Sequence, residues 1–169
     1  MKVAILTMFN GLSETYSLVN VVKEHLKMLL DAGISTKVLV SENCPDEERS
    51  GIFADERLEW VKITNKLAGK QIHWHDYSKP DGELHDTFFA EADAIAQDFV
   101  THLKDVSDCI MHDIHYQGWH LVHNAAIRIT QKQLPHVKFI AVTHSAPVNR
   151  PPNPKYPFSY RYTPMPNTI

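Results

Sequence analysis

The sequence lacks the patterns that mark secreted, membrane-spanning and zinc-binding proteins. Its only cysteines, Cys44 and Cys109, lie far apart and show no C-x-x-C spacing, which argues against a disulfide framework and a zinc knuckle. No apolar run approaches the roughly 18 residues that a membrane span needs, and the first run, Val3 to Leu6, is too short for a signal-peptide core. We therefore expect a soluble, cytoplasmic protein with both thiols reduced and with Cys109 in a core strand.

Basic residues are not in excess either. The net charge is -3 at pH 7 and the pI is about 6.4, so the chain has no basic stripe that could neutralise phosphates along DNA or RNA. The glycine-rich motifs of dinucleotide-binding and P-loop proteins, G-x-G-x-x-G and G-x-x-x-x-G-K-[ST], are also absent. We expect no direct nucleic-acid binding and no bound cofactor.

What the sequence does contain is an alternation of strand and helix patterns. An apolar run from Val3 to Met8 precedes a turn-prone segment and a stretch with helical spacing, which Gly33 ends as a C-terminal cap would. A second strand, residues 35–41, completes a βαβ unit whose two strands should be parallel. With 169 residues, of which 43% are hydrophobic, a single domain is expected.

The same alternation continues to residue 143. Further strands are predicted at 58–63, 109–112 and 138–143, and further helices over 87–103 and 120–133. These elements predict an α/β fold over residues 1–146, a doubly wound, Rossmann-like parallel sheet with helices on both faces. Residues 64–86 are predicted to be an irregular excursion, and the proline-rich residues 147–169 an extended tail.

Ligands of open parallel sheets bind beyond the carboxyl ends of the strands, at the point where the strand order reverses. Three loops should meet there, those after the first, fourth and fifth strands. Their candidate residues are Asn10 and Gly11, then His112, Asp113, His115 and Tyr116, then His144 and Ser145. A carboxylate such as Asp113 can orient a sugar hydroxyl or act as a base, and an imidazole can donate to a hydroxyl or a phosphate. Among the candidates for catalysis, His144 stands first.

Each candidate also has a purely structural interpretation. Gly11 allows the backbone to approach a phosphate at the start of the first helix, but it can equally be an ordinary turn glycine. Strand-end histidines often hydrogen-bond a neighbouring carbonyl, and His144 and Ser145 can simply begin a turn into Pro147.

Histidine-rich patterns raise the question of a metal site. They are His73-x-His75-Asp76, His112-x-x-His115 and His120-x-x-His123. None matches a closed set of three or four ligands and H-E-x-x-H is absent, so no metal is expected. A serine hydrolase would need a G-x-S-x-G elbow, which the sequence also lacks.

Several local strings resemble the N-terminal domain of GT-B glycosyltransferases of the retaining, nucleotide-sugar-dependent kind. They are KVAILT (2–7), LLDAG (29–33), TKVLV (36–40), DCIMHD (108–113) and FIAVTHS (139–145). The resemblance implies the acceptor-side domain of a transferase that takes a sugar from a nucleotide-sugar donor to a separate acceptor without a bound metal.

By this resemblance, Asn10 and Gly11 would border the donor diphosphate, while His112, Asp113 and His144 would line the cleft where the acceptor meets the transferred sugar. The chain departs from the family pattern because its first loop has one glycine and because the donor half, with its two spaced glutamates, is missing. Its last five residues resemble the stretch that leads into that half. This chain alone is therefore expected to be inactive.

Two other functional classes stay open. The chain can be a non-catalytic α/β module that binds a small ligand or a partner protein through the same loops. It can also be a metal-dependent hydrolase that uses the histidines, although no ligand set supports this. The sequence does not specify the donor sugar, the acceptor, the stereochemical outcome or the oligomeric state.

Overall fold

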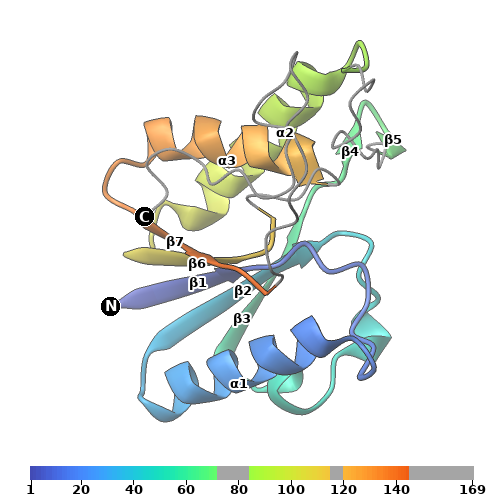
Figure 1. Cartoon of the computed structure of the whole chain (residues 1–169). Coiled ribbons are helices and arrows are strands. Elements are labelled where there is room, and N and C mark those ends of the chain that lie inside the picture. Colours follow the sequence, from blue (N-terminus) through green and yellow to red (C-terminus); the bar gives the residue numbers. More distant parts are fainter. Residues whose placement is uncertain (72–83, 115–119, 145–169) are drawn as a thin grey trace.

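The computed structural model describes residues 1–71, 84–114 and 120–144, which form a three-layer α/β fold. A five-stranded parallel sheet is the middle layer, in the order β3-β2-β1-β6-β7. Its strands are β1 (Lys2–Leu6), β2 (Ser35–Ser41), β3 (Leu58–Ile63), β6 (Asp108–His112) and β7 (Lys138–Val142). Figure 1 shows α1 (Ser17–Asp31) on one face and α2 (Phe88–Leu103) and α3 (Leu121–Gln133) on the other. The predicted doubly wound fold is confirmed.

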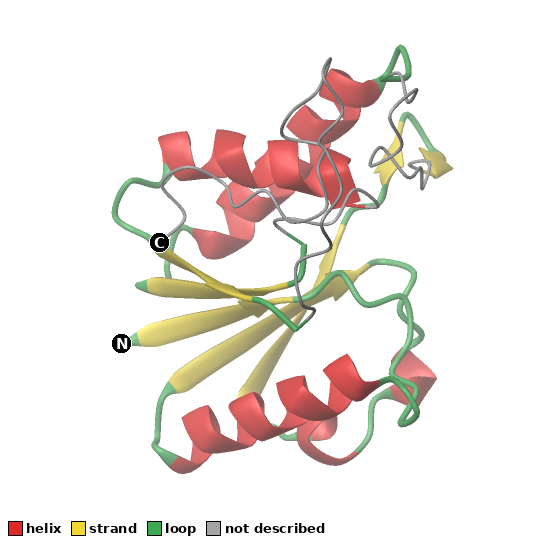
Figure 2. Ribbon diagram, in the orientation of Figure 1, coloured by secondary structure: helices red, strands yellow, loops and turns green. Residues whose placement is uncertain are grey.

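Shorter elements lie between β2 and α2. The 3-10 turns η1 (Asp46–Glu48) and η2 (Gly51–Ala54) precede β3, and the two-residue strands β4 (Lys66–Leu67) and β5 (Lys70–Gln71) form an antiparallel hairpin after it (Figure 2). This hairpin is regular structure inside a segment predicted to be irregular. Among the described residues, no helix combines the length and the apolar character needed to cross a bilayer.

The centre of the sheet is β1, which pairs on both sides. Leu6 lies beside Leu39 of β2 on one side and beside Met111 of β6 on the other. The chain therefore winds outward from β1 in one direction through β2 and β3, and in the other through β6 and β7. The strand order therefore reverses between β1 and β6, and open α/β sheets bind their ligands at the carboxyl ends of the strands at such a point.

The end of α1 follows from a glycine, as predicted. Gly33 has φ 70°, a left-handed conformation that costs glycine little. Its N–H donates to the carbonyl of Leu30, and the N–H of Ile34 donates to the carbonyl of Leu29. This pair of bonds is the Schellman motif, which satisfies carbonyls at the helix end and turns the chain toward β2.

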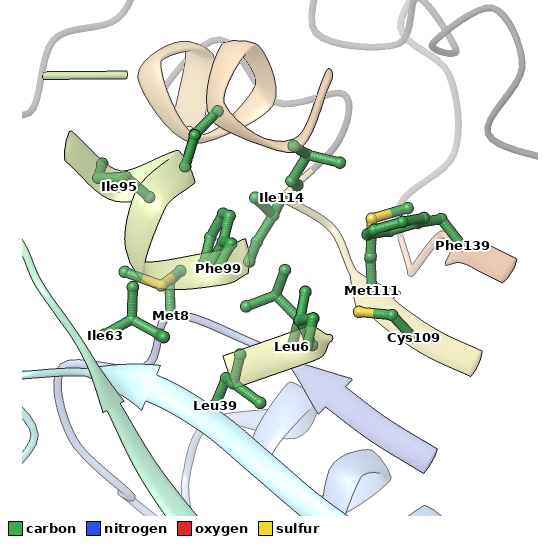
Figure 3. Packing of buried hydrophobic residues seen from close by; sticks show 14 of the residues in the cluster. Leu6, Met8, Leu39, Ile63, Ile95, Phe99, Cys109, Met111, Ile114 and Phe139 are labelled. Atoms are coloured by element: carbon green, nitrogen blue, oxygen red, sulfur yellow. The ribbon is translucent and has the colours of Figure 1, made fainter. Parts of the chain in front are cut away.

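Two apolar cores cover the two faces of the sheet because neighbouring strand residues point to opposite faces. Ile5 packs in a cluster with residues of α1 and β2, such as Val22. The next residue, Leu6, belongs to the cluster under α2 and α3, where Figure 3 shows it near Phe99. Burial on both faces explains why the strands read as continuous apolar runs. Cys109 is fully buried in this second core, as predicted, and burial raises the pKa of its thiol.

The predicted boundaries need small corrections. Met8 and Thr143 lie outside the strands to which they were assigned, because β1 ends at Leu6 and β7 at Val142. Helix α3 begins at Leu121 rather than at His120. The strand at 58–63 and the helix after Thr87 are confirmed, while the predicted tail at 147–169 lies outside the described residues.

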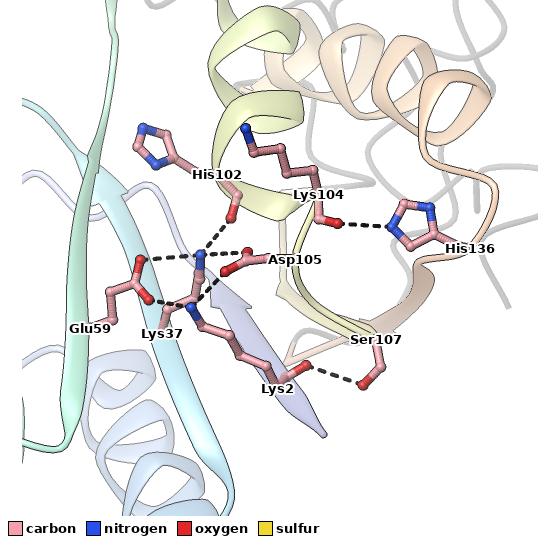
Figure 4. A network of polar contacts seen from close by, with 8 residues as sticks. All are labelled: Lys2, Lys37, Glu59, His102, Lys104, Asp105, Ser107 and His136. Carbon is pink, nitrogen blue, oxygen red and sulfur yellow. Dashed lines mark hydrogen bonds and ion pairs between the residues drawn. The ribbon is translucent and has the colours of Figure 1, made fainter.

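A network of charges ties the amino ends of the strands to the end of α2 (Figure 4). The ammonium of Lys37, which is buried, lies 2.8 Å from Asp105 Oδ1 and 3.2 Å from Glu59 Oε1, and it donates to the carbonyl of His102. Lys2 pairs with the same two carboxylates at 2.7 and 2.6 Å. Hydrogen bonds from Lys2 and then Lys37 lower the pKa of Asp105 to about 2.

We expect Asp105→Asn to lower the free energy of unfolding at pH 7 by about 1 to 3 kcal/mol, because Lys37 stays buried with one carboxylate fewer. The charged carboxylate stabilises the fold above its usual pKa near 3.8, and this contribution is lost as the pH falls toward 2. Urea unfolding at pH 7, 4 and 2 should therefore show the variant and the wild type converging in acid. Asp93→Asn, at an exposed position of α2, is the control. Equal stabilities at pH 7 would contradict the prediction.

Candidate functional site

A pocket of about 280 Å³ opens at the carboxyl ends of β1 and β6, where the winding of the sheet reverses. Two loops and the start of two helices line it. The lining residues are Thr7, Met8, Phe9, Asn10, Gly11, Tyr16, Leu18, His112, Asp113 and His120. The pocket thus lies where ligands of open α/β sheets bind.

The backbone is strained on both sides of this pocket. Met8 follows β1 with φ 53° and Asp113 follows β6 with φ 61°. Residues other than glycine rarely adopt such positive backbone angles. Each costs on the order of 1 to 3 kcal/mol and persists only where neighbouring bonds hold it. The Thr7 N–H donates to the carbonyl of Leu39 at 3.1 Å, and the Asp113 N–H donates to that of Val142 at 3.2 Å. The two turns aim Met8 and Asp113 into one pocket.

The loop from β1 to α1 forms one wall. Its ring pair, Phe9 and Tyr16, packs edge to face with centroids 5.9 Å apart. Gly11 lies six positions before Ser17, the first residue of α1. It is therefore not part of the helix N-terminus, where the sequence led us to expect that Gly11 would let the backbone approach a phosphate. Next to it, the N–H of Leu12 donates to the carboxylate of Glu48.

Asp113 is the carboxylate of the pocket. It is 7% exposed, and its Oδ1 accepts the backbone N–H of His144 at 3.0 Å. Partial burial and, to a smaller extent, the charge of Asp113 raise the pKa of Tyr16, so this phenol keeps its proton at neutral pH. The pocket therefore combines a hydroxyl donor with a carboxylate acceptor.

Three histidines from distant parts of the chain form a row next to this carboxylate. His112 Nδ1 lies 2.8 Å from His144 Nε2, and the two rings stack at 11°. The other nitrogen of His112, Nε2, lies 3.4 Å from Nδ1 of His25 on α1. A neutral imidazole has one donor and one acceptor nitrogen, so a neutral His112 donates a hydrogen bond to one neighbour and accepts one from the other.

This row has the geometry of hydrogen bonds and not of a shared metal. Nitrogens that ligate one tetrahedral zinc at about 2.0 to 2.1 Å lie roughly 3.3 Å apart, so the His112–His144 pair at 2.8 Å is too close. His112 also offers a different nitrogen to each neighbour, so the three rings cannot share one ion. Across the described parts of the chain, no group of three or more His, Cys, Asp or Glu side chains could hold a metal ion.

His120 and His123, one of the pairs noted in the sequence, are both desolvated. Their rings meet edge to face with centroids 5.6 Å apart. Burial lowers the pKa of His120 to about 4 and that of His123 to about 3. Both imidazoles are therefore neutral at pH 7, and His120 presents no positive charge to the pocket.

The structure brings together most of the predicted site residues that it describes. Asn10, Gly11, His112 and Asp113 line the pocket, and His144 contacts His112 and Asp113 without lining it. His115, Tyr116 and Ser145 lie outside the described residues, as do residues 73–76 of the third histidine pattern.

Sequence reasoning missed three contributors to the site. Tyr16 directly precedes α1, His25 lies within α1, and Glu48 is the last residue of η1. A histidine among lysines and glutamates was the only signal for His25, and it is weak.

Comparison of the chain with known protein families, with curated proteins and with solved structures finds no match.

Stability should fall when the pH drops below about 6.5, because the unfolded chain protonates histidines that the folded state keeps neutral. Each such histidine contributes a slope of about 1.4 kcal/mol per pH unit until its folded pKa is reached. The His123→Leu variant keeps only His120 of the two buried histidines, so the decrease in the free energy of unfolding between pH 6.5 and 4.5 should be roughly halved. Urea unfolding at several pH values measures this, with the exposed His136→Gln as control. An unchanged slope in His123→Leu would refute the assignment.

Proposed function

We propose that this chain is the acceptor-side domain of a glycosyltransferase and that the pocket between β1 and β6 holds the acceptor. The single observation that carries the proposal is the Asp113 carboxylate, set in a strained turn at the reversal point of the sheet and lining the pocket. It supports the resemblance to GT-B N-terminal domains, in which this position would face the acceptor.

The character of the pocket suits a sugar or a similar polyol. Its volume of about 280 Å³ is near the lower end of the usual range for small-molecule sites. Asp113 can accept a hydroxyl proton, and Asn10 and Tyr16 can donate and accept in turn. Sugars also present apolar C–H faces, and Met8 and Phe9 offer apolar surface to them.

In the proposed reaction, the acceptor hydroxyl oxygen bonds to the anomeric carbon of the donor sugar. The bond from that carbon to the diphosphate oxygen breaks, and the nucleotide diphosphate leaves with the electron pair. The hydroxyl proton passes to a base, for which Asp113 is placed in the pocket and His144 is placed next to it. The donor is held by a second domain, as in GT-B enzymes.

The histidine row holds His144, the second candidate base, in place. His144 stands 2.8 Å from His112, and His112 in turn reaches His25. The hydrogen bond to His112 and the backbone bond to Asp113 fix the orientation of the His144 ring beside the carboxylate.

We expect Asp113→Asn to weaken the binding of a neutral sugar about ten- to a hundredfold, because hydrogen bonds to charged groups contribute about 1.5 to 3 kcal/mol. Asparagine tolerates the left-handed backbone at this position and can still accept the N–H of His144, so the fold should be kept. Titration of the chain with a panel of unphosphorylated mono- and disaccharides, followed by saturation-transfer NMR, measures the effect. Asp93→Asn is the matched control.

Two results would count against the proposal. If no sugar binds, or if binding is equal in the wild type and in Asp113→Asn, the pocket is not an acceptor site. A sugar that binds without any transfer, when the chain is tested with nucleotide-sugar donors and the proposed donor domain, would instead favour a non-catalytic sugar-binding module.

In the transfer assay with the proposed donor domain, His144→Ala should reduce the transfer rate roughly ten- to a hundredfold, in keeping with the loss of one base or charge-assisted contact. A wild-type rate in His144→Ala would exclude His144 from the reaction.

A further inference from the structure

A second pocket, of about 300 Å³, lies where the first turn of α2 meets α3. These two helices cover the same face of the sheet and pack against each other (Figure 1). The described lining of this pocket is Phe88, Phe89, Asn124, Ala125, Arg128 and Ile129. It shares no residue with the described lining of the pocket at the carboxyl ends of β1 and β6. The second pocket is therefore a separate place at which a small molecule can bind.

Apolar side chains form most of its described wall. Phe88 is buried in the core under the two helices, whereas the next residue, Phe89, is 64% exposed. Their rings meet edge to face with centroids 5.2 Å apart. Ala125 and Ile129, on α3, are half-buried and pack against the same core. An aromatic or alkyl group in this pocket would take apolar surface of Phe89 out of water, which the hydrophobic effect favours.

Arg128 is the one charged residue of this described lining. Its Nε donates a hydrogen bond to Oδ1 of Asn124, one helical turn earlier, at 3.1 Å. Asn124 is itself buried, so the bond holds the guanidinium in place at the wall of the pocket. The two terminal nitrogens of an arginine form the fork that binds a carboxylate through two parallel hydrogen bonds.

Among the described residues, Arg128 has no carboxylate as an ion-pair partner. Glu91, the acidic residue in the first turn of α2, bonds instead to His85 and Thr87. Arg128 is half-buried, and this burial lowers the pKa of its guanidinium. Charges that leave water are usually paired with an opposite charge. The described part of the pocket thus offers a cation and apolar walls to a ligand that brings its own anion.

We propose that the pocket between α2 and α3 binds a small apolar monocarboxylate, whose carboxylate pairs with Arg128 and whose aromatic or alkyl body lies against Phe89 and Ile129. One arginine balances one negative charge, whereas a phosphate monoester carries nearly two at pH 7. A sugar would leave most of its hydroxyl groups against apolar walls without partners, which costs free energy. The site is independent of the acceptor site proposed above.

The test uses 3-phenylpropionate as the probe and 3-phenylpropan-1-ol as its neutral counterpart. NMR titrations of the whole chain at pH 7 follow the backbone amide signals of Phe89, Ala125 and Ile129. The carboxylate should shift these signals in a saturable way. The alcohol should bind about ten- to a hundredfold more weakly, because it fills the apolar part of the pocket but offers no charge to Arg128.

Variants assign the effect to particular side chains. Arg128→Gln should lower the affinity for 3-phenylpropionate to that for the alcohol, and Arg128→Lys, which keeps the charge and loses the fork, should fall between. Phe89→Ser removes the exposed ring and should weaken the binding of both probes. Lys132→Gln is the matched control, since Lys132 is exposed one turn further along α3 and the net charge changes by the same amount. It should bind both probes as the wild type does.

The proposal is overturned if 3-phenylpropionate gives no saturable shift of these signals or if the alcohol binds as tightly as the carboxylate. Both results come from the wild type, so they stand even if a variant fails to fold, which thermal unfolding checks. Equal binding of the carboxylate by Arg128→Gln and Lys132→Gln would also overturn it. Arg128→Gln changes no residue of the other described lining, so sugar binding there should be unaffected, and the two proposals can fail separately.

Discussion

The structure depends on the position of β1, which is hydrogen-bonded to β2 on one side and to β6 on the other. The chain leaves β1 toward α1 on one face of the sheet, and it leaves β6 toward α3 on the opposite face (Figure 1). Because the winding of the sheet reverses between these two strands, their carboxyl ends form the place where open α/β sheets bind ligands. The pocket is a consequence of this topology, and any side chain at these strand ends is placed around it.

The strain at Met8 and Asp113 belongs to the same constraint. Both residues take left-handed backbone values directly beyond strands that pair with each other. The bonds from Thr7 to Leu39 and from Asp113 to Val142 tie each turn to the next strand of the sheet, so the packed core supports the cost. Such strain is retained most often where it aims a functional side chain, and here it aims the only carboxylate of the described pocket lining.

The two ends of the sheet use charge in opposite ways. At the amino ends, Lys2 and Lys37 are neutralised by Glu59 and Asp105, in a network that stabilises the fold. At the carboxyl ends, Asp113 accepts the backbone N–H of His144 and Glu48 accepts that of Leu12, and no lysine or arginine of the described pocket lining balances Asp113. The first arrangement ties strands and helix together, while the second leaves the Asp113 carboxylate lining the pocket.

The sequence by itself determined the order of strands and helices, because apolar periodicity and the glycine after α1 are local signals. It also placed Asn10, Gly11, His112 and Asp113 at one edge, because parallel strands bring their carboxyl ends together. Only the tertiary structure decided which side chains meet there. His25 reaches His112 across 87 positions and Glu48 reaches Leu12 across 36, and no local pattern records contacts over such separations. The neutral state of His120 and the position of Gly11 beside the carboxylate of Glu48 depend on that packing, since burial and neighbouring charge arise only when the chain is folded.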